Sequence, residues 1–331
     1  MKDDAQPGPP VAPPWGQLVH LSRPPLESQL VSLAADQGLE PKSARRLVEL
    51  LIEFDQMGVH THGLWQFGRY LGAFREGALN PQARLITLRR TPCSAALCSD
   101  GGLGLLVLDE AIERAVALAE ESGVGLVTTC NHGHLGGLGL AARRATRQGL
   151  VALICGAKAL DPAWLAPHGK VEDSARRNPP LALGLPGPGP DFVLDFGLRA
   201  RKPREVWIKI PDVFVWVFGL AHGVGLLTDL AAHEAPPCSY PAADERAFLM
   251  VFSPSLFGSV ERLRRQVGEL YRQVSRQDPV PGLTATLPGG LEWELSQRLQ
   301  AVDQVRIHRS TLELLHRLGV ENSPVADWGP G

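Results

Sequence analysis

The sequence has almost no excess of charge of either sign. It contains 33 lysines and arginines against 35 aspartates and glutamates, which gives a formal net charge of −2 over 331 residues. The two signs are mixed along the chain, without the basic surface that nucleic acid or an anionic membrane would attract. We therefore expect neither nucleic acid nor a membrane among the partners of this protein.

Long apolar runs and an apolar leader are also missing. The runs at 213–220 and 223–227 are interrupted by Gly and His and fall short of the roughly 20 residues that cross a bilayer. The Pro-rich start has no hydrophobic core of the kind found in signal peptides. Five cysteines without CxxC spacing favour reduced, buried thiols over a disulfide framework. Together these features predict a cytoplasmic protein.

Both ends of the chain differ in character from its middle. Residues 1–25 are rich in Pro and Gly and poor in aliphatic side chains, so we expect a disordered tail whose removal leaves thermal stability nearly unchanged. Residues 26–90 are expected to form an N-terminal helical part. Within it, the segments 26–38 and 41–57 have helical patterns, and the second carries its apolar side chains on one broad face.

The middle of the chain, residues 91–250, alternates helical and strand signals. An amphipathic helix over 108–121 is followed by short apolar strands over 123–129 and 151–155. Strands that are buried on both faces by helices predict an α/β core. Residues 251–331 return to helical periodicity, and we expect them to pack back on the N-terminal part.

The sharpest local feature is a histidine that follows the helix over 41–57. This histidine, His62, lies beside a glycine at a helix-to-loop junction, where a side chain is accessible, in the sequence Asp55-Gln-Met-Gly-Val-His-Thr-His62-Gly63. An imidazole with its ordinary pKa near ~6.5 suits proton transfer at neutral pH. Because a lone histidine is more often structural, the interpretation of His62 depends on the surrounding sequence.

That surrounding text, residues 55–81, resembles the signature of the malate/L-lactate dehydrogenase family. It holds an acidic residue and a glycine, Thr-His-Gly, Arg-Tyr and Gly-Ala-Leu-Asn-Pro in the order typical of that family. Asp-Gly-Gly-Leu-Gly at 100–104 and Asn-His-Gly-His-Leu-Gly-Gly-Leu-Gly at 131–139 continue the likeness, followed by Asn-Pro at 178–179 and a Gly-rich segment at 219–226. The shared order and spacing, rather than any single motif, make the resemblance specific.

The resemblance implies a non-Rossmann α/β fold of the malate/L-lactate dehydrogenase type, with a helical part built from both chain ends. The absence of a GxGxxG motif is therefore no argument against a nicotinamide cofactor. The expected activity is hydride transfer between NAD or NADP, which the sequence does not distinguish, and a small 2-hydroxy or 2-oxo acid. The resemblance also implies a homodimer whose active site is completed near a subunit interface.

Roles for single residues follow from the same resemblance. His62 is expected to remove the hydroxyl proton during oxidation and to return it during reduction. Asp195 matches a family aspartate and either orients the imidazole or caps a structural element. Gln66 and Arg69 are the candidates for substrate binding. The candidates for cofactor binding are His134, Gly136, Gly139, Asn178, His222 and Gly223.

The Gly-rich segment at 131–139 has a physical use regardless of ancestry. Glycines without Cβ atoms let backbone N–H groups approach a pyrophosphate, and a helix that begins near Leu138 would direct its positive end toward it. A tight strand-to-helix turn explains each single glycine equally well.

Three departures from the family pattern support an alternative function. Gln66 stands where the family carries an arginine, His222 stands where it carries a lysine, and the segment between Asp195 and Gly219 is much shorter. An amide can hydrogen-bond a carboxylate but cannot neutralise it. The alternative is a catalytically impaired family member that acts as a dimeric binding or interaction protein.

A further interpretation uses the histidine pairs alone. His60 and His62, with His132 and His134, could form a four-histidine metal site, because alternate residues of a strand share one face. A helical segment precedes His60 and no carboxylate cluster accompanies the pairs. We therefore expect no metal.

Overall fold

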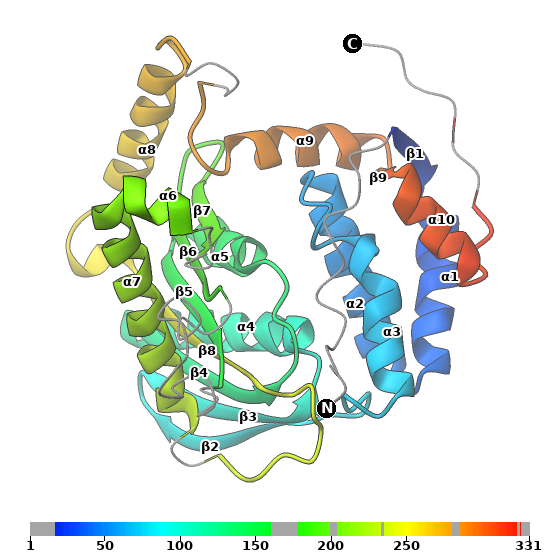
Figure 1. The fold of residues 1–331 in the computed structure, drawn as a ribbon. Helices are drawn as coiled ribbons and strands as arrows, with labels where there is room; N and C mark the ends of the chain where they lie inside the picture. The colour runs from blue at the N-terminus through cyan, green and yellow to red at the C-terminus, as the bar shows by residue number, and fades with distance from the viewer. Residues whose placement is uncertain are drawn as a thin grey trace. The chain divides into compact units, whose positions relative to one another are not determined.

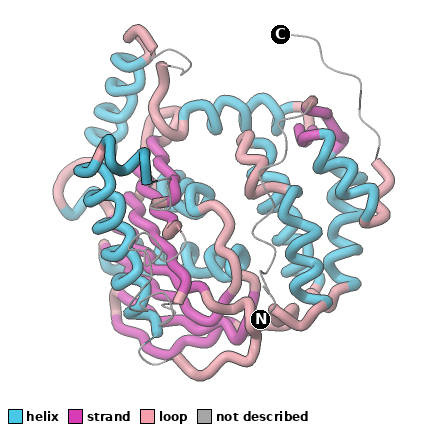
Figure 2. Tube along the Cα trace, viewed as in Figure 1, coloured by secondary structure: helices cyan, strands magenta, loops and turns pink. Residues whose placement is uncertain are grey.

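The computed structural model describes residues 17–159, 178–198, 204–232, 235–279, 285–322 and 325. The chain divides into two compact units (Figures 1 and 2). The first contains residues 1–72 and 292–331, and the second contains residues 73–291.

The first unit combines helices from both chain ends with a small sheet. Strand β1 (Leu18–Ser22) pairs antiparallel with β9 (Gln304–His308), so that Leu21 lies opposite Val305 and both are buried. The helices are α1 (Arg23–Asp36), α2 (Pro41–Gln56), η1 (Leu64–Gln66), α3 (Phe67–Arg75), α9 (Gly290–Ala301) and α10 (Arg309–Arg317), with α3 and α9 continuing into the second unit.

Helix α2 forms the centre of this unit. The helix predicted over 41–57 is confirmed, and its apolar face is buried as the periodicity required. Leu47, Leu51 and Phe54 are at most 1% exposed. Asp55 is buried among them at the end of the helix, where an unpaired carboxylate would be strongly disfavoured.

The prediction of a disordered tail over residues 1–25 is wrong for residues 18–25. Residues 18–22 form β1, and α1 begins at Arg23 with Pro24 in its first turn. Val19 and Leu21 are buried because they alternate along a strand that pairs with residues almost 290 positions away. The composition of residues 1–25 gives no indication of that distant partner strand.

Removal of residues 1–25 should therefore destabilise the first unit, since it removes one of two paired strands.

The second unit is built on a seven-stranded mixed sheet with the order β2-β3-β4-β8-β5-β6-β7. The β3–β4 pair is parallel and the other pairs are antiparallel. The strands are β2 (Leu85–Thr91), β3 (Ser94–Gly102), β4 (Val124–His132), β5 (Val151–Lys158), β6 (Pro180–Leu185), β7 (Phe192–Gly197) and β8 (Glu245–Phe252).

Helices cover both faces of this sheet (Figure 1). Ala247 and Leu249 of β8 point into the core formed with α4 (Gly104–Ser122) and α5 (Leu138–Arg147). Phe248, between them, belongs to the core of the opposite face, which α7 (Pro211–Asp229) covers. The remaining helices are η4 (Leu230–Ala232), η5 (Pro254–Leu256), α6 (Arg204–Lys209) and α8 (Val260–Val274). The predicted α/β class, with a helical part built from both chain ends, is confirmed.

The boundaries differ from the expected ones in two respects. Residues 73–90, expected in the N-terminal helical part, belong to the unit that holds the sheet, and β2 begins among them at Leu85. Residues 251–291, which contain α8, belong to the unit that holds the sheet, and only the residues from 292 onward cluster with the N-terminal segment. Helical periodicity identifies a helix and its apolar side, but it does not identify the core that receives that side.

Helix α7 also corrects the expectation about apolar runs. The runs at 213–220 and 223–227 join into one helical segment of 22 residues, Pro211–Ala232, since the intervening Gly and His do not interrupt it. Its most apolar 18-residue stretch has a mean hydropathy of 1.7. By length and composition alone this segment could cross a membrane. Ala221 and Val224 on one of its sides are buried against the sheet, and 22% of its most apolar stretch is buried in total.

The contact between α4 and β4 provides a test of the packing. A Cβ atom at Gly125 would overlap the carbonyl oxygen of Ala115, so the Gly125→Ala variant must move the helix off the strand. We expect the free energy of unfolding in urea to fall by about 3 kcal/mol, the upper range for overpacking. Gly258→Ala is the control, because a Cβ atom there meets open space. Equal stability of the two variants would contradict this packing.

Candidate active site

His62 lies in a tight turn between α2 and η1. Gly58 begins the turn with a φ of +76°, a left-handed conformation that favours glycine. The His62 N–H donates to the carbonyl oxygen of Val59 at 2.9 Å, and Thr61 Oγ1 lies 3.1 Å from His62 Nδ1. The ring packs at a centroid distance of 5.9 Å from Phe54. The turn thus directs the imidazole against the apolar end of α2.

The buried carboxylate of Asp55 fastens this turn on both sides of His62. One oxygen accepts a hydrogen bond from His60 Nδ1 at 2.7 Å, and the other accepts the Leu64 N–H at 2.7 Å. A Cβ atom at Gly63 would overlap the same carboxylate, so only glycine fits there. Burial raises the pKa of Asp55, whereas the hydrogen bonds from His60 and Leu64 lower it.

Further contacts join the turn to the small sheet of the same unit. The His60 ring meets the edge of the His308 ring at a centroid distance of 4.7 Å. Gln56 Nε2 donates to the carbonyl oxygen of Gln304 at 3.0 Å. His308 and Gln304 are the two ends of β9, so a strand from the C-terminal part of the chain supports the turn that carries His62.

The surroundings of His62 favour its neutral form. Burial lowers the pKa of His62, the positive charge of Arg69 adds a smaller contribution in the same direction, and together they bring it to about 4. The imidazole is therefore uncharged at neutral pH and can accept a proton.

The two candidate substrate-binding residues lie within the same stretch of chain. Gln66 Nε2 donates to the carbonyl oxygen of Thr61 at 2.6 Å, which ties η1 to the residue before His62. Gln66 Oε1 is buried, and within the part of the chain that the structure describes it has no hydrogen-bond donor. Arg69 is exposed, with its guanidinium 5.2 Å from the centre of the Tyr70 ring. The first unit thus places His62 in the turn, Gln66 at the end of η1 and Arg69 in α3, which follows directly.

The predicted cofactor segment forms a loop from the end of β4 to the start of α5 in the second unit. His132 is fully buried in it, with Nε2 2.9 Å from Thr129 Oγ1 and Nδ1 2.9 Å from the carbonyl oxygen of Gly133. Burial lowers the pKa of His132 to about 4. Gly136, with a φ of +74°, donates its N–H to His134 Nδ1 at 3.3 Å.

Two carboxylates hold this loop through backbone N–H groups. Glu245 Oε2 accepts the Leu135 N–H at 3.2 Å, and Asp195 Oδ2 accepts the Gly139 N–H at 2.7 Å. Gly139 is in the first turn of α5, so Asp195 places a negative charge at the positive end of that helix. Of the two interpretations of Asp195, this contact matches the capping aspartate. His62 belongs to the other unit.

The remaining predicted residues are distributed over the second unit. Asn178 has a φ of +83°, and its side chain fills the space that a Cβ atom at Gly197 would need. His222 Nδ1 donates to the carbonyl oxygen of Phe218 within α7 at 2.8 Å. Gly223, on the same helix, faces open space.

Two of the residues that hold these loops, Asp55 and Glu245, were not identified in that role from the sequence, whereas a capping role for Asp195 was one of the alternatives. Asp55 was noted as part of a motif, yet its burial between His60 and Leu64 was not foreseen. An acidic residue next to Phe54 on the apolar face of a helix is the signal that could have identified it. Glu245 is the first residue of the apolar strand β8, and nothing in the neighbouring sequence indicates that its carboxylate accepts the Leu135 N–H.

The four-histidine interpretation gains no support from the geometry. No group of three or more His, Cys, Asp or Glu side chains within the described ranges is arranged to hold a metal ion. His60 is hydrogen-bonded to Asp55, and the two ring nitrogens of His132 lie within hydrogen-bond distance of Thr129 Oγ1 and the Gly133 carbonyl oxygen.

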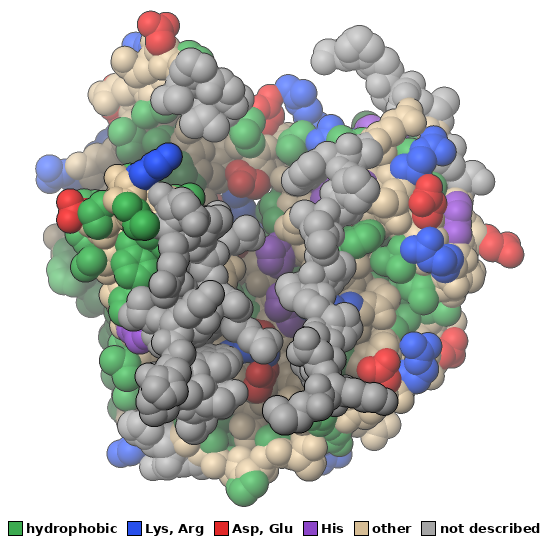
Figure 3. All heavy atoms as spheres, in the orientation of Figure 1, with side chains coloured by type: hydrophobic (Ala, Val, Ile, Leu, Met, Phe, Trp, Pro, Cys, Tyr) green, Lys and Arg blue, Asp and Glu red, His purple; other side chains and the backbone are tan. Residues whose placement is uncertain are grey.

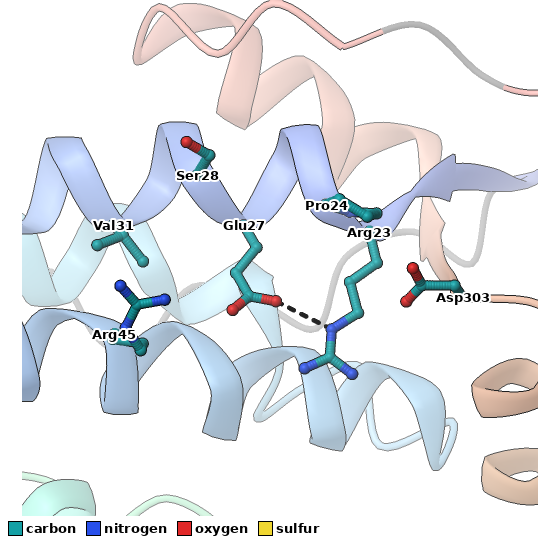
Figure 4. A pocket seen from close by; sticks show the side chains of 7 residues that line it. All are labelled: Arg23, Pro24, Glu27, Ser28, Val31, Arg45 and Asp303. Atoms are coloured by element: carbon teal, nitrogen blue, oxygen red, sulfur yellow. Dashed lines mark hydrogen bonds and ion pairs between the residues drawn. The ribbon is translucent and has the colours of Figure 1, made fainter.

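A separate cleft of about 370 Å³ lies at the start of α1 in the first unit (Figure 4). Arg23 Nε donates to Glu27 Oε2 at 3.0 Å across it, and Arg45 and Asp303 complete its polar lining. The cations and carboxylates balance each other, so this cleft shows no preference for an anionic acid.

Comparison with known proteins identifies the family. A model of the malate/L-lactate dehydrogenase family matches residues 22–200, and the chain belongs to this family of oxidoreductases. It is 24% identical over 330 residues to the ureidoglycolate dehydrogenase (NAD(+)) of Escherichia coli strain K12, covering 87% of this chain and 92% of that protein. It is 24% identical over 292 residues to the L-sulfolactate dehydrogenase of Methanocaldococcus jannaschii, covering 77% and 84% of the two chains.

Solved structures share the fold. The malate dehydrogenase of Pyrococcus horikoshii OT3 superimposes with a TM-score of 0.75 at 20% identity, over 94% of this chain and 99% of that one. The sulfolactate dehydrogenase of Methanocaldococcus jannaschii gives a TM-score of 0.70 at 19% identity, over 91% and 98%. The family match ends at residue 200, before α6 and α7.

The buried histidines predict how stability depends on pH. Between pH 6.5 and 4 the unfolded chain binds protons at His62 and His132 that the folded chain does not, so stability should fall as the pH falls through this range. In urea unfolding, His132→Gln should remove roughly 3 kcal/mol of that pH dependence. His316→Gln, at an exposed position, is the control. Stability that stays constant from pH 6.5 to 4 would contradict the burial of both rings.

Proposed function

We propose that this protein is an NAD(P)-dependent oxidoreductase that transfers hydride between a nicotinamide cofactor and a small 2-hydroxy or 2-oxo acid. The observation that carries the proposal is the neutral, half-buried imidazole of His62 in a turn fastened by Asp55. The relatives named for ureidoglycolate, L-sulfolactate and malate support the substrate class.

His62 is the proton-transfer residue of this mechanism. During oxidation the neutral ring accepts the proton of the substrate hydroxyl group while hydride leaves the carbon atom that carries this group. During reduction the protonated ring returns the proton to the carbonyl oxygen. We assign the exchanged proton to Nε2, because Nδ1 lies 3.1 Å from Thr61 Oγ1. The nicotinamide, when bound, supplies the hydride acceptor or donor.

Arg69 couples substrate binding to the basicity of His62. Its positive charge contributes to the low pKa of His62, and its exposed guanidinium suits a substrate carboxylate. When a carboxylate neutralises Arg69, that contribution is reduced and the pKa of His62 rises toward neutrality. The base thus becomes stronger when substrate is present.

Gln66 has a positioning role in this scheme. Its amide holds the carbonyl oxygen of Thr61 and so fixes the residue before His62. The carboxylate charge is then met by Arg69, because the uncharged amide of Gln66 cannot neutralise it.

The loop between β4 and α5 is our candidate for holding the nicotinamide dinucleotide. The Gly139 N–H already serves Asp195, and the Leu135 N–H serves Glu245, so these two donors do not suit a pyrophosphate. The two carboxylates are acceptors that suit ribose hydroxyl groups. We assign the cofactor to this loop through His134 and Gly136, whereas contributions from Gly139, Asn178, His222 and Gly223 stay predictions.

We further propose that the protein acts as a homodimer in the cytoplasm. The five cysteines are free thiols, which suits a reducing compartment. The competing function is a non-catalytic binding protein. It predicts that the fluorescence of NADH and that of NADPH do not change when the purified protein is added.

Replacement of His62 tests the mechanism. The His62→Ala variant should lower kcat by about 10²-fold or more, the scale for loss of a general acid–base group, while cofactor affinity stays close to that of the wild type. His62→Gln should lose as much, because an amide does not exchange a proton at neutral pH. Absorbance of the reduced nicotinamide across a panel of 2-oxo acids measures both. Wild-type turnover in His62→Ala would refute the role of His62 and direct the search to His134.

Restoring the family arginine tests substrate recognition. Gln66→Arg should lower KM for a small 2-oxo acid by about tenfold, through two charge-assisted hydrogen bonds to its carboxylate. Gln66→Lys is the matched control, since lysine brings the charge without the fork. The gain should disappear with the amide analogue of the same acid. An unchanged KM in steady-state kinetics would mean that position 66 does not face the carboxylate.

A further inference from the structure

Two cysteines of the second unit lie side by side across neighbouring strands. Cys98 of β3 and Cys130 of β4 are direct partners in the parallel register. They are 1% and 0% exposed, and both pack with Ala231 of η4 in one small core, so their side chains share a face of the sheet. Neighbouring strands are about 4.7–4.9 Å apart, and a disulfide bridges Cα atoms that are about 4.4–6.8 Å apart. The backbone thus meets the spacing that a disulfide between these two residues requires.

The two thiols differ in how readily they ionise. Hydrogen bonds from Cys130 and from Asn131 Nδ2, which lies 3.4 Å from Cys98 Sγ, lower the pKa of the Cys98 thiol to about 7, although burial opposes them. The hydrogen bond to Cys98, together with burial, raises the pKa of Cys130. At neutral pH a large share of Cys98 is therefore thiolate, while Cys130 keeps its proton. A thiolate is the form that attacks an oxidant, and a neighbouring thiol converts the product into a disulfide.

Cys155 of β5 shows what burial does to a thiol without such a partner. It is 1% exposed, and the residues opposite it on β8 and β6 are Phe248 and Leu181. Burial raises the pKa of its thiol to about 12, so it stays protonated and unreactive at neutral pH. The low pKa of Cys98 therefore comes from its contacts and not from burial itself.

The layer of chain over the two thiols is thin. Ala231 of η4 and Ala235 pack against the pair, and Leu230, next to Ala231, is 51% exposed. The short helix η4 directly follows α7, and hydrophobic side chains gather over α6 and α7 at the left of Figure 3. A molecule as small as a hydroperoxide therefore reaches Cys98 through local opening of η4, without unfolding of the sheet.

The pair adjoins the loop that we assign to the cofactor. Asn131 follows Cys130 directly and is the first residue of the Gly-rich segment 131–139, and the regular register of β3 and β4 ends at the pair. Asn131 has a φ of +56°, which is uncommon outside glycine, and its Nδ2 also donates to the carbonyl oxygen of Pro236 at 2.8 Å. A disulfide would take from Asn131 the Cys98 thiolate as a hydrogen-bond acceptor. Its formation should therefore displace the start of the loop.

We propose that Cys98 and Cys130 are a redox site at which a small hydroperoxide forms a reversible disulfide, and that this disulfide weakens binding of the cofactor. The second part rests on the proposed function and on the assignment of the nicotinamide dinucleotide to the loop after β4. Disulfides in reducing compartments are usually transient and serve catalysis or redox sensing, which suits a pair that can be reduced again.

The reaction consumes one peroxide and two thiols. The Cys98 thiolate attacks one oxygen of hydrogen peroxide, the O–O bond breaks, and the departing hydroxide takes up a proton to become water. The Cys130 sulfur then attacks the sulfur of the resulting sulfenic acid at Cys98. The S–O bond breaks, and the hydroxyl group leaves with the Cys130 proton as a second water molecule. A dithiol reverses the change by thiol–disulfide exchange and itself becomes a disulfide.

Thiol titration tests the disulfide. The full-length Cys93→Ser/Cys238→Ser protein lacks the two part-exposed thiols and keeps the three buried ones. After an excess of hydrogen peroxide and denaturation, dithiobis(nitrobenzoate) should detect one thiol per chain, and all three again after dithiothreitol. Peptide mapping should link Cys98 to Cys130. In the same background, Cys155→Ala should leave no detectable thiol after oxidation, whereas Cys98→Ala should form no disulfide.

Cofactor affinity tests the second part of the proposal. In the same background, the Kd for NADH from fluorescence titration should rise by about fivefold or more after peroxide, the lower end of the usual coupling between two sites. Dithiothreitol should restore the original value. Peroxide should leave the Kd of Cys98→Ala unchanged, because this variant lacks the thiolate that reacts first.

The possible results separate the claims. Three thiols after peroxide, a sulfinic acid at Cys98 without a disulfide, or a bridge to Cys238 in the wild type would overturn the redox site. A disulfide that leaves the Kd for NADH unchanged would overturn its effect on the cofactor. If the reduced protein binds neither NADH nor NADPH, the proposed function and this effect both fall, while the thiol titration still decides whether the disulfide forms.

Discussion

The site in the first unit depends on one buried carboxylate. Asp55 accepts a hydrogen bond from His60 on one side of His62 and from the Leu64 N–H on the other, so a single side chain fixes both ends of the turn. Removal of one partner of such a buried pair leaves the other uncompensated, which costs more than the pair itself contributes. The requirement for Gly63 and the contact with His308 both follow from the place of this carboxylate.

The second unit uses the same physical device. Asp195 and Glu245 each accept a backbone N–H of the Gly-rich loop, and these hydrogen bonds add to the burial of Leu135 and Leu138 in the core. Glycines there serve the packing of the protein as well as any ligand, since a Cβ atom at Gly139 would lie 3.1 Å from Asp195. Carboxylates that hold backbone N–H groups therefore position both of the loops that the proposed chemistry needs.

Local patterns in the sequence predicted the features that depend on local periodicity and order. The apolar side of α2, the α/β class and the family, with His62 at a helix-to-loop junction, all follow from residues close together in the chain. The features that sequence reasoning missed depend on distant partners. Strand β1 exists because β9 pairs with it, and Glu245 has its role because β8 lies beside β4 in the sheet. The length of α7 was missed for a different reason. Its glycines and His222 were expected to interrupt the apolar runs, whereas the helix continues through them where it packs on the sheet.

The central claim is that His62 is a neutral base whose strength rises when Arg69 meets a carboxylate. Its most direct test is an NMR titration of the His62 ring, assigned with the His62→Gln variant, with and without a saturating 2-oxo acid. We predict a pKa of about 4 in the free protein, where burial and Arg69 both lower it, and a higher pKa in the complex, where the carboxylate offsets the charge of Arg69. A His62 ring that is already protonated at neutral pH in the free protein, or a pKa that does not change when the acid binds, would contradict the claim.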